Sequence, residues 1–204
     1  MSLLKPLWKP RTVLKTARLV LRPPHKRDAA MLAHHLSDSR VSTMLTHVAL
    51  PYADERAANW IAGMQAEIRR GEARYFVLER GSAVVGLAGL DGIDGKSAEL
   101  GYWLGHPWWG KGLMSEAVRP ILRMAWQHPA LERITAVHMV DNPASGRLLL
   151  KAGFKYTGTV KLHSRARGMD VMCRTMAKER PKRALRSEAK PGVRGLHPFR
   201  QPSI

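Results

Sequence analysis

The segment from Glu99 to Ser115 reads ELGYWLGHPWWGKGLMS, and it constrains the fold of this chain more than any other segment. It predicts a strand that runs directly into a glycine-punctuated loop, which in turn opens a helix. Glycines let a backbone turn tightly and approach an anion, while the first N–H groups of the next helix face that anion. The arrangement suits a pyrophosphate. Gly110 and Gly112 alone form a weak motif, because glycine pairs are common at strand-to-helix turns.

Three further blocks give the loop its context. Residues 141–145 read DNPAS and residues 148–154 read LLLKAGF. With the glycine loop, these blocks resemble the acyl-coenzyme A core of the GNAT superfamily of N-acetyltransferases. Residues 16–23, TARLVLRP, resemble the RimJ/RimL branch, which acetylates protein N-termini. The resemblance extends over about residues 12 to 177. It implies an acetyl-CoA-dependent N-acetyltransferase whose acceptor is a protein N-terminal amine, such as that of a ribosomal protein.

The same resemblance implies where the cofactor binds. The strand end is expected to pair through its backbone with the pantetheine arm, and the loop is expected to hold the pyrophosphate with added charge from Lys111. The predicted cofactor-binding residues are Tyr102, Trp103, Leu104, Trp109, Gly110, Lys111, Gly112, Leu113, Met114, Ser115, Asn142 and Ser145. Trp109 and Met114 depart from the general family pattern. These departures leave the backbone contacts of the loop possible, but they remove any side-chain contact that the first loop residue makes in the family. Asn142 has an alternative interpretation as a helix N-cap before Pro143.

The proton chemistry is also assigned by resemblance. Many superfamily members use a tyrosine seven residues after the asparagine, and Leu149 stands at that position here. Ser145 is the implied replacement that protonates the coenzyme A thiolate; the alternative is a serine that only caps a helix. Glu99 is the candidate base, acting through water, or else part of a strand-edge ion pair. Water alone is a further alternative, because α-amines have pKa values near 7.7–8.0.

Length and composition are typical of a soluble globular protein with one sizeable core. The chain has 204 residues, of which 45% are hydrophobic and 25% charged. No apolar run approaches the ~20 residues that cross a bilayer, so no membrane partner is expected. Cys173 is the single cysteine, which excludes an internal disulfide and suits a cytoplasmic location. His34 and His35 would face different sides of a helix without a third ligand nearby, so no metal is expected.

The net charge of +18 is spread along the chain. The last 27 residues hold eight Lys/Arg and two Asp/Glu, a net +6, which leaves +12 for the rest. Such charge attracts phosphate-rich partners, here coenzyme A, rRNA or a ribosomal surface. The alternative is a generally arginine-rich surface that is simply solvated.

The pattern along the chain predicts one α+β (α/β) domain. We expect an N-terminal extension at 1–11, the acetyltransferase domain at 12–177 and a disordered, basic, proline-containing tail at 178–204. The domain should hold a mixed, largely antiparallel twisted sheet of about seven strands flanked by about four helices. Strands are predicted at 19–22, 75–78, 84–90, 97–104, 134–140, 154–156 and 169–176, and helices at 26–37, 55–70, 113–127 and 143–151. Asp54 is the predicted cap of the second helix, and Gly71 is its predicted end.

Two other functions fit the same residues. The first keeps the chemistry and changes the acceptor to a polyamine, an amino sugar or an amino-acid derivative. The second is a catalytically weak protein that sits on the ribosome or RNA through its basic surface. An intact coenzyme A loop argues against the second. The segment from Met44 to Tyr52, between the first two predicted helices, is the predicted substrate-facing loop.

Overall fold

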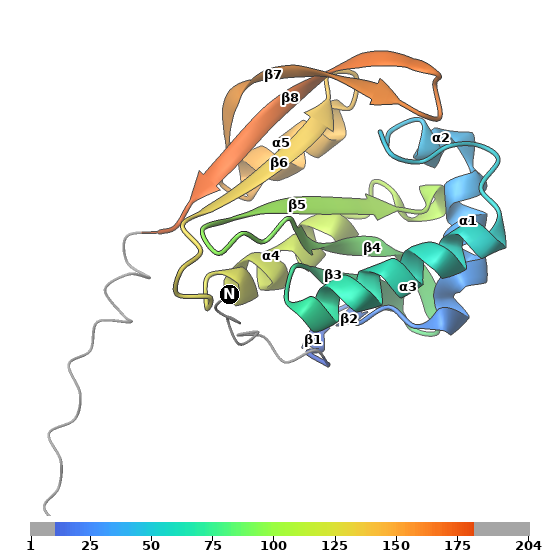
Figure 1. The fold of residues 1–204 in the computed structure, drawn as a ribbon, viewed down its shortest axis with the longest axis horizontal. Helices are drawn as coiled ribbons and strands as arrows, with labels where there is room; N and C mark the ends of the chain where they lie inside the picture. The colour runs from blue at the N-terminus through green and yellow to red at the C-terminus, as the bar shows by residue number, and fades with distance from the viewer. Residues whose placement is uncertain (1–10, 182–204) are drawn as a thin grey trace, which may run out of the picture.

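The structure is a computed structural model that describes residues 11–181 (Figure 1). Residues 1–10 and 182–204, which hold most of the predicted extension and tail, lie outside the described residues. The elements are β1 (Leu14–Lys15), β2 (Val20–Arg22), the 3₁₀ helix η1 (Lys26–Asp28), α1 (Ala29–Ser37), α2 (Ser39–Ser42), α3 (Asp54–Arg70), β3 (Arg74–Arg80), β4 (Ala83–Asp91), β5 (Ser97–Leu104), the 3₁₀ helix η2 (His106–Trp108), α4 (Leu113–Ala125), β6 (Arg133–Met139), α5 (Pro143–Lys151), β7 (Lys155–Ser164) and β8 (Met169–Glu179).

The strands form one twisted sheet in the order β1-β2-β3-β4-β5-β6-β8-β7. Neighbouring strands are antiparallel except β5 and β6, which run parallel. The predicted fold class is therefore confirmed. The strand and helix numbers were slightly too low, because the two-residue β1 and the four-residue α2 were not predicted. Both elements are too short to show a hydrophobic period in sequence.

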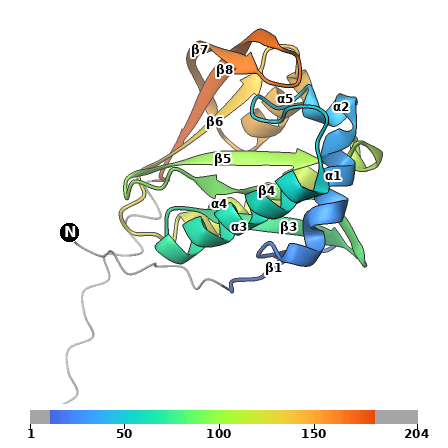
Figure 2. The same ribbon diagram turned by 45° about the vertical axis from the view of Figure 1, so that its right-hand side comes forward.

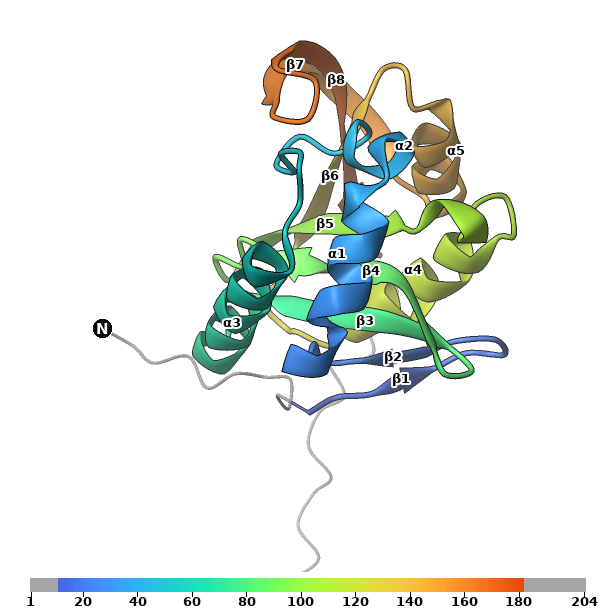
Figure 3. The ribbon, with the colours of Figure 1, turned by 90° about the vertical axis from the view of Figure 1, so that its right-hand side faces the viewer.

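Helices cover both faces of the sheet, which gives two large apolar cores, and a smaller buried cluster of Met139, Val171 and Cys173 lies on β6 and β8. α1 and α3 pack on one face against Val77, Leu87 and Trp103, while α4 and α5 pack on the other. Figure 3 shows the two helix layers on either side of the strands. Successive residues of a strand point to opposite faces, so each core takes every second residue of the central strands. In residues 11–181, no helix is both long and apolar enough to cross a membrane.

The pairing between β5 and β6 is short. β5 pairs with β4 as far as Leu104, and β6 pairs with β8 as far as Met139, but β5 and β6 share only three residue pairs. The last of these is Glu99↔Thr135. Beyond it the two strands diverge, as Figures 1 and 2 show. We call the place where they part the split.

Several predicted boundaries need correction. α3 begins at Asp54 itself, its N-cap is Ala53 and no side chain caps it, so the predicted cap at Asp54 was wrong. Gly71 does end this helix, with a left-handed φ of 80° that favours glycine. β7 runs to Ser164, well past the predicted end at 156, because its mostly exposed residues give little apolar signal. β8 runs to Glu179 rather than 176.

The last described residues pack on the domain. Arg180 is 7% exposed; its Nε donates to the carbonyl of Leu131 at 2.7 Å and its Nη2 donates to the carbonyl of His128. The guanidinium also lies 5.9 Å from the ring of Trp126. Arg180 therefore holds the segment after α4 against the end of β8, and we propose that the domain extends to Arg180, past the predicted boundary at 177.

Replacing Arg180 with methionine should lower the free energy of unfolding. The apolar stem would remain, but buried carbonyls would lose their donor, which costs about 1–3 kcal/mol. Urea denaturation measures this. Arg119→Met is the control, because Arg119 is exposed on α4 and should change stability little. Equal stability of both variants would contradict the assignment of Arg180 to the domain.

Candidate active site

The predicted pyrophosphate loop forms the start of α4. Gly110 and Gly112 both have positive φ, 70° and 71°, which explains glycine at these positions. Gly112 is the N-cap, and no side chain caps the helix. The side chains of Leu113 and Met114 are buried, so these residues can meet a ligand only through their backbone. The uncapped amides of the first turn fit a phosphate group, because they keep their hydrogen-bonding capacity.

Aromatic and basic side chains hold this loop in place. Trp109 Nε1 donates to the carbonyl of Leu104 at 2.7 Å, and Lys111 Nζ donates to the carbonyl of Pro107 at 2.8 Å. The ammonium of Lys111 also lies 5.3 Å from the ring of Trp108. Trp109, assigned only a cofactor role from sequence, thus ties the loop to the end of β5.

Arg18 is a site residue that the sequence analysis missed. Its Nη1 donates to the carbonyl of Lys111 at 2.9 Å, and its Nε pairs with Glu116 at 2.7 Å. Arg18 thus reaches the start of α4 from the connection between β1 and β2, where its charge is paired with Glu116 in the first turn of the helix. The block at residues 16–23 served only to identify a family, so nothing in it indicated a place beside the loop.

The split exposes backbone groups of β5. The amide of Gly105 donates to Val85 on β4, and residues along a strand alternate between its two edges. Tyr102 and Leu104 therefore present their N–H and C=O groups toward β6, where the pairing has ended. The Leu104 carbonyl is bonded to Trp109, which leaves Tyr102 as the residue best placed to pair with an extended ligand arm. The Trp103 side chain is buried in the core beneath α1 and α3.

Ser145 meets Tyr102 across the split. The Ser145 Oγ and the Tyr102 hydroxyl are 2.8 Å apart, and either can donate. Asn142 caps α5, since its Oδ1 accepts the Ser145 amide at 3.1 Å. The second interpretation of Asn142, as the N-cap of α5, is therefore confirmed. The hydroxyl of Ser145 does not cap the helix and instead makes a hydrogen bond with Tyr102. Burial raises the pKa of Tyr102 to about 12, and the bond to Ser145 acts in the opposite direction. Tyr102 therefore keeps its proton at neutral pH.

An acidic set lies on the opposite face of the sheet, defined as Glu67, Asp91 and Glu99, of which the first two contact the hydroxyl of Tyr75. Tyr75 donates to Glu67 at 2.8 Å and approaches Asp91 at 3.4 Å, while Asp91 and Glu99 are paired positions on neighbouring strands. Burial raises the pKa of Asp91 to about 6, helped by the negative charge of Glu99. Next along β5, Gly101 has open space where a side chain would be. Sequence reasoning proposed Glu99 as base but did not pair it with Asp91.

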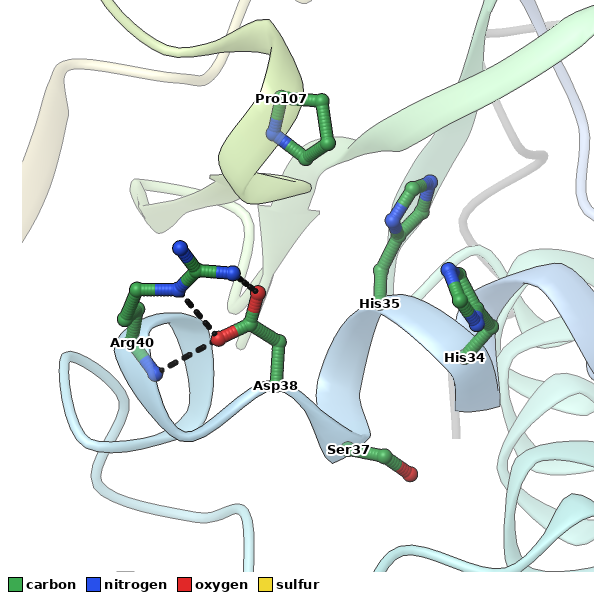
Figure 4. A pocket seen from close by; sticks show the side chains of 6 residues that line it. All are labelled: His34, His35, Ser37, Asp38, Arg40 and Pro107. Carbon is green, nitrogen blue, oxygen red and sulfur yellow. Dashed lines mark hydrogen bonds and ion pairs between the residues drawn. The ribbon is translucent and has the colours of Figure 1, made fainter.

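A separate hollow lies between the end of α1 and η2 (Figure 4). It is lined by His34, His35, Ser37, Asp38, Arg40 and Pro107. Its two charged side chains neutralise each other, because Arg40 Nη2 lies 2.7 Å from Asp38 Oδ2. None of the predicted cofactor residues lines this hollow, so we separate it from the site around the split. Within residues 11–181, no group of three or more His, Cys, Asp or Glu side chains is arranged to hold a metal ion.

Comparison with known proteins gives consistent matches. A family model described as an acetyltransferase (GNAT) domain matches residues 18–155. The [ribosomal protein uS5]-alanine N-acetyltransferase of Escherichia coli (strain K12) is 32% identical over 166 residues, 74% of this chain and 82% of that protein. The structure of RimL, a ribosomal L7/L12 alpha-N-protein acetyltransferase in complex with coenzyme A, is similar with a TM-score of 0.75 at 20% identity, covering 82% of this chain and 98% of RimL. Mycobacterium smegmatis RimJ in complex with CoA-disulfide gives 0.68 at 24% identity, covering 78% and 81%.

The raised pKa of Asp91 predicts a pH-dependent stability. An unfolded aspartate titrates near 3.9, so folding disfavours the charged form of Asp91 and its contribution to stability falls as pH rises from about 4 to 6. Asp91→Asn should therefore raise the melting temperature at pH 7.5, and this gain should vanish near pH 4. Thermal unfolding across that range measures the effect.

Asp94, in the adjoining loop, provides a control because its pKa is shifted in the opposite direction to that of Asp91. Hydrogen bonds from the amides of Ser97 and Lys96 lower the pKa of Asp94. Its charged form stabilises the fold above the unfolded pKa, and that contribution is lost as pH falls. Asp94→Asn should therefore bring no gain at pH 7.5. If Asp91→Asn were also no more stable than the wild-type protein at that pH, the conclusion that folding disfavours the charged form of Asp91 would be wrong.

Proposed function

The chain belongs to the GNAT family of N-acetyltransferases, and on this basis we propose that it transfers the acetyl group of acetyl-CoA to a protein N-terminal amine such as that of a ribosomal protein. The observation that carries the chemistry is the arrangement at the split. Tyr102 and Ser145 lie on the face covered by α4 and α5, whereas Glu99 projects from the face covered by α1 and α3. A donor entering from one face and an acceptor entering from the other would meet where β5 and β6 part.

The start of α4 and the edge of β5 are the proposed acetyl-CoA site. The uncapped amides after Gly112 would receive the pyrophosphate, with the positive charge of Lys111 nearby and the Arg18–Glu116 ion pair beside it. The free backbone groups of Tyr102 would pair with the pantetheine arm as an added strand would. Asn142 is proposed to contact the same arm in addition to capping α5. Trp103, Leu104, Trp109, Gly110, Met114 and Ser115 remain part of this proposed set through their place in the loop or on the strand.

Acetyl-CoA, when bound, supplies a thioester whose C–S bond breaks as the amine nitrogen forms a C–N bond, giving an amide and coenzyme A. An ordinary thiol has a pKa near 8.5, so the departing sulfur needs a hydrogen bond more than a strong acid. With Tyr102 donating to the Ser145 Oγ, the Ser145 proton is left to point at that sulfur. Because Tyr102 keeps its own proton at neutral pH, it orients Ser145 and does not compete as a base.

The acidic set is proposed to receive the acceptor ammonium. Glu99, exposed at the last rung between β5 and β6, would take a proton from the amine directly or through water, and Asp91 beside it would strengthen the attraction. A weak base is sufficient for this proton transfer, because the pKa of an α-amine is near 7.7–8.0. The same acidic set favours a second candidate acceptor, a small cationic amine such as a polyamine.

A substrate screen decides between these acceptors. The purified protein and acetyl-CoA are incubated with N-terminal peptides of ribosomal proteins and with small amines, and acetylated products are identified by mass spectrometry. Acetylation of the α-amine of one or more peptides supports the proposal. Acetylation of polyamines alone would replace it with the small-amine alternative. Association with the ribosome or rRNA through the basic surface and the tail is tested separately by co-sedimentation at low and high salt.

Gly112→Glu should abolish acetyl-CoA binding. The new side chain would occupy the phosphates' place and oppose their charge. Gly95→Glu is the matched control, because Gly95 also has a positive φ, 97°, with open space for a side chain, and it lies before β5, at the opposite end of that strand from the loop. Calorimetry of both folded variants measures the difference. Unchanged affinity in Gly112→Glu would remove the loop from the proposed site.

Ser145→Ala should lower kcat with little change in acetyl-CoA affinity, because it removes an interaction made with the leaving group. Groups that act on protons in this way typically contribute ~10²–10⁴-fold. Tyr102→Phe should reduce kcat in the same direction by a smaller factor, since the serine hydroxyl stays but loses its orienting partner. A Ser145→Ala enzyme with full activity and only a lower melting temperature would leave Ser145 with a structural role.

A further inference from the structure

Three chain segments meet at one guanidinium near the start of α5. Arg167, in the turn between β7 and β8, donates from Nε to the carbonyl of Thr43 at 2.8 Å. Its Nη1 pairs with Asp141 Oδ2 at 2.5 Å, and its Nη2 lies 3.8 Å from Met44 Sδ. Figures 1 and 3 show this turn beside α2. Arg167 thus joins the β7–β8 turn, the segment after α2 and the turn before α5.

Two of these segments belong to opposite sides of the proposed site. Asp141 directly precedes Asn142, which caps α5 and holds the amide of Ser145. Thr43 and Met44 begin the stretch that leads to α3, and His47 within it acts electrostatically on the pKa of Asp91. The Arg167 guanidinium therefore lies between the turn that positions the leaving-group donor and the segment next to the acidic set.

The chemistry of this contact requires arginine. The guanidinium donates hydrogen bonds to a carbonyl and a carboxylate at once, because its N–H groups are fixed in one plane. A lysine ammonium carries its donors on a single nitrogen at the end of a flexible side chain and cannot reproduce this geometry. The Arg167 side chain is 21% exposed and that of Asp141 is 56% exposed, so the bond to the Thr43 carbonyl is better shielded from solvent than the ion pair. The stretch from Thr43 to Ala53 lies outside regular secondary structure, so its position depends on the core packing of Val48 and Tyr52 and on side-chain and turn contacts of this kind.

We infer that Arg167 is a positioning residue that fixes the acceptor-side segment 43–53 relative to the start of α5. The inference rests on the proposed function. An amine must come within about 3–3.5 Å of the thioester carbonyl, and small misplacements of either side reduce the rate strongly. Arg167 contacts neither the α4 loop nor the β5 edge in the structure, so its effect should fall on the acceptor and not on acetyl-CoA.

The experiment compares Arg167→Met, Arg167→Lys and Asp141→Asn, with Arg165→Met as the matched control. Arg165 lies exposed in the same turn and bonds the Thr46 carbonyl through its backbone amide at 3.0 Å, so its side chain can be removed without losing that bond. Arg167→Met should lower kcat/KM for the acceptor roughly tenfold while acetyl-CoA affinity by calorimetry stays within about twofold. Arg167→Lys should remain impaired, Arg165→Met should match the wild type, and adding Asp141→Asn to Arg167→Met should cause little further loss.

Hydrogen exchange provides a readout that does not depend on activity. In Arg167→Met the amides of residues 43–53 should exchange faster than in the wild type and in Arg165→Met, with the sheet unchanged. Unaltered exchange in this segment, or equal loss of acetyl-CoA and acceptor binding, would overturn the positioning role. If the wild-type protein acetylated none of the acceptors, the proposed function would fail, and the exchange result alone would decide whether Arg167 holds the segment.

Discussion

The short pairing between β5 and β6 is the constraint on which the rest of the site depends. Each strand is held along its other edge, β5 by β4 and β6 by β8, so neither can close the split after Glu99 and Thr135. Unpaired backbone groups in a sheet are costly unless water, side chains or a ligand satisfy them. At Leu104 the indole of Trp109 does so, and at Tyr102 the groups remain available. The sheet thus exposes a binding edge at its centre, where strands are ordinarily paired on both sides.

The two faces of the sheet have different electrostatic characters around that split. On one face, helix amides and Lys111 provide positive potential beside the Arg18–Glu116 ion pair, and the neutral Tyr102 hydroxyl supports Ser145. On the other face, carboxylates are brought close enough that the pKa of Asp91 is raised to about 6 by burial and by Glu99. In the proposed function, an anionic donor and a cationic acceptor would thereby be attracted to opposite faces. The raised pKa of Asp91 also means that a bound ammonium would relieve an unfavourable interaction of the free protein.

The sequence predicted the fold class and the central β5–loop–α4 unit well, because long strands with alternating residues and an amphipathic helix carry a strong local signal. β5 and α5 match the predicted ranges at both ends. Contacts between distant segments could not be read in this way. Arg18 reaches Lys111, and Arg167 reaches Thr43 and Asp141, only after the sheet has formed. The Tyr102–Ser145 pair was missed for the same reason, since each residue was singled out separately and nothing local joins them.

The strong positive net charge of the chain and the acidic set at the proposed acceptor face are compatible, because the two act on a ligand over different distances. At physiological ionic strength, charges are screened over about 8 Å, so an exposed ammonium at the split is influenced mainly by its immediate neighbours. Those neighbours are Glu99, Asp91 and, across the Tyr75 hydroxyl, Glu67. The net charge of +18 acts instead on large polyanions, which meet many basic residues at once. A ribosomal acceptor would use both effects, because rRNA would attract the basic surface while the acidic set receives one N-terminal amine. A free polyamine would gain only from the acidic set, whereas a ribosomal acceptor would gain from both effects, which favours the protein N-terminus as acceptor.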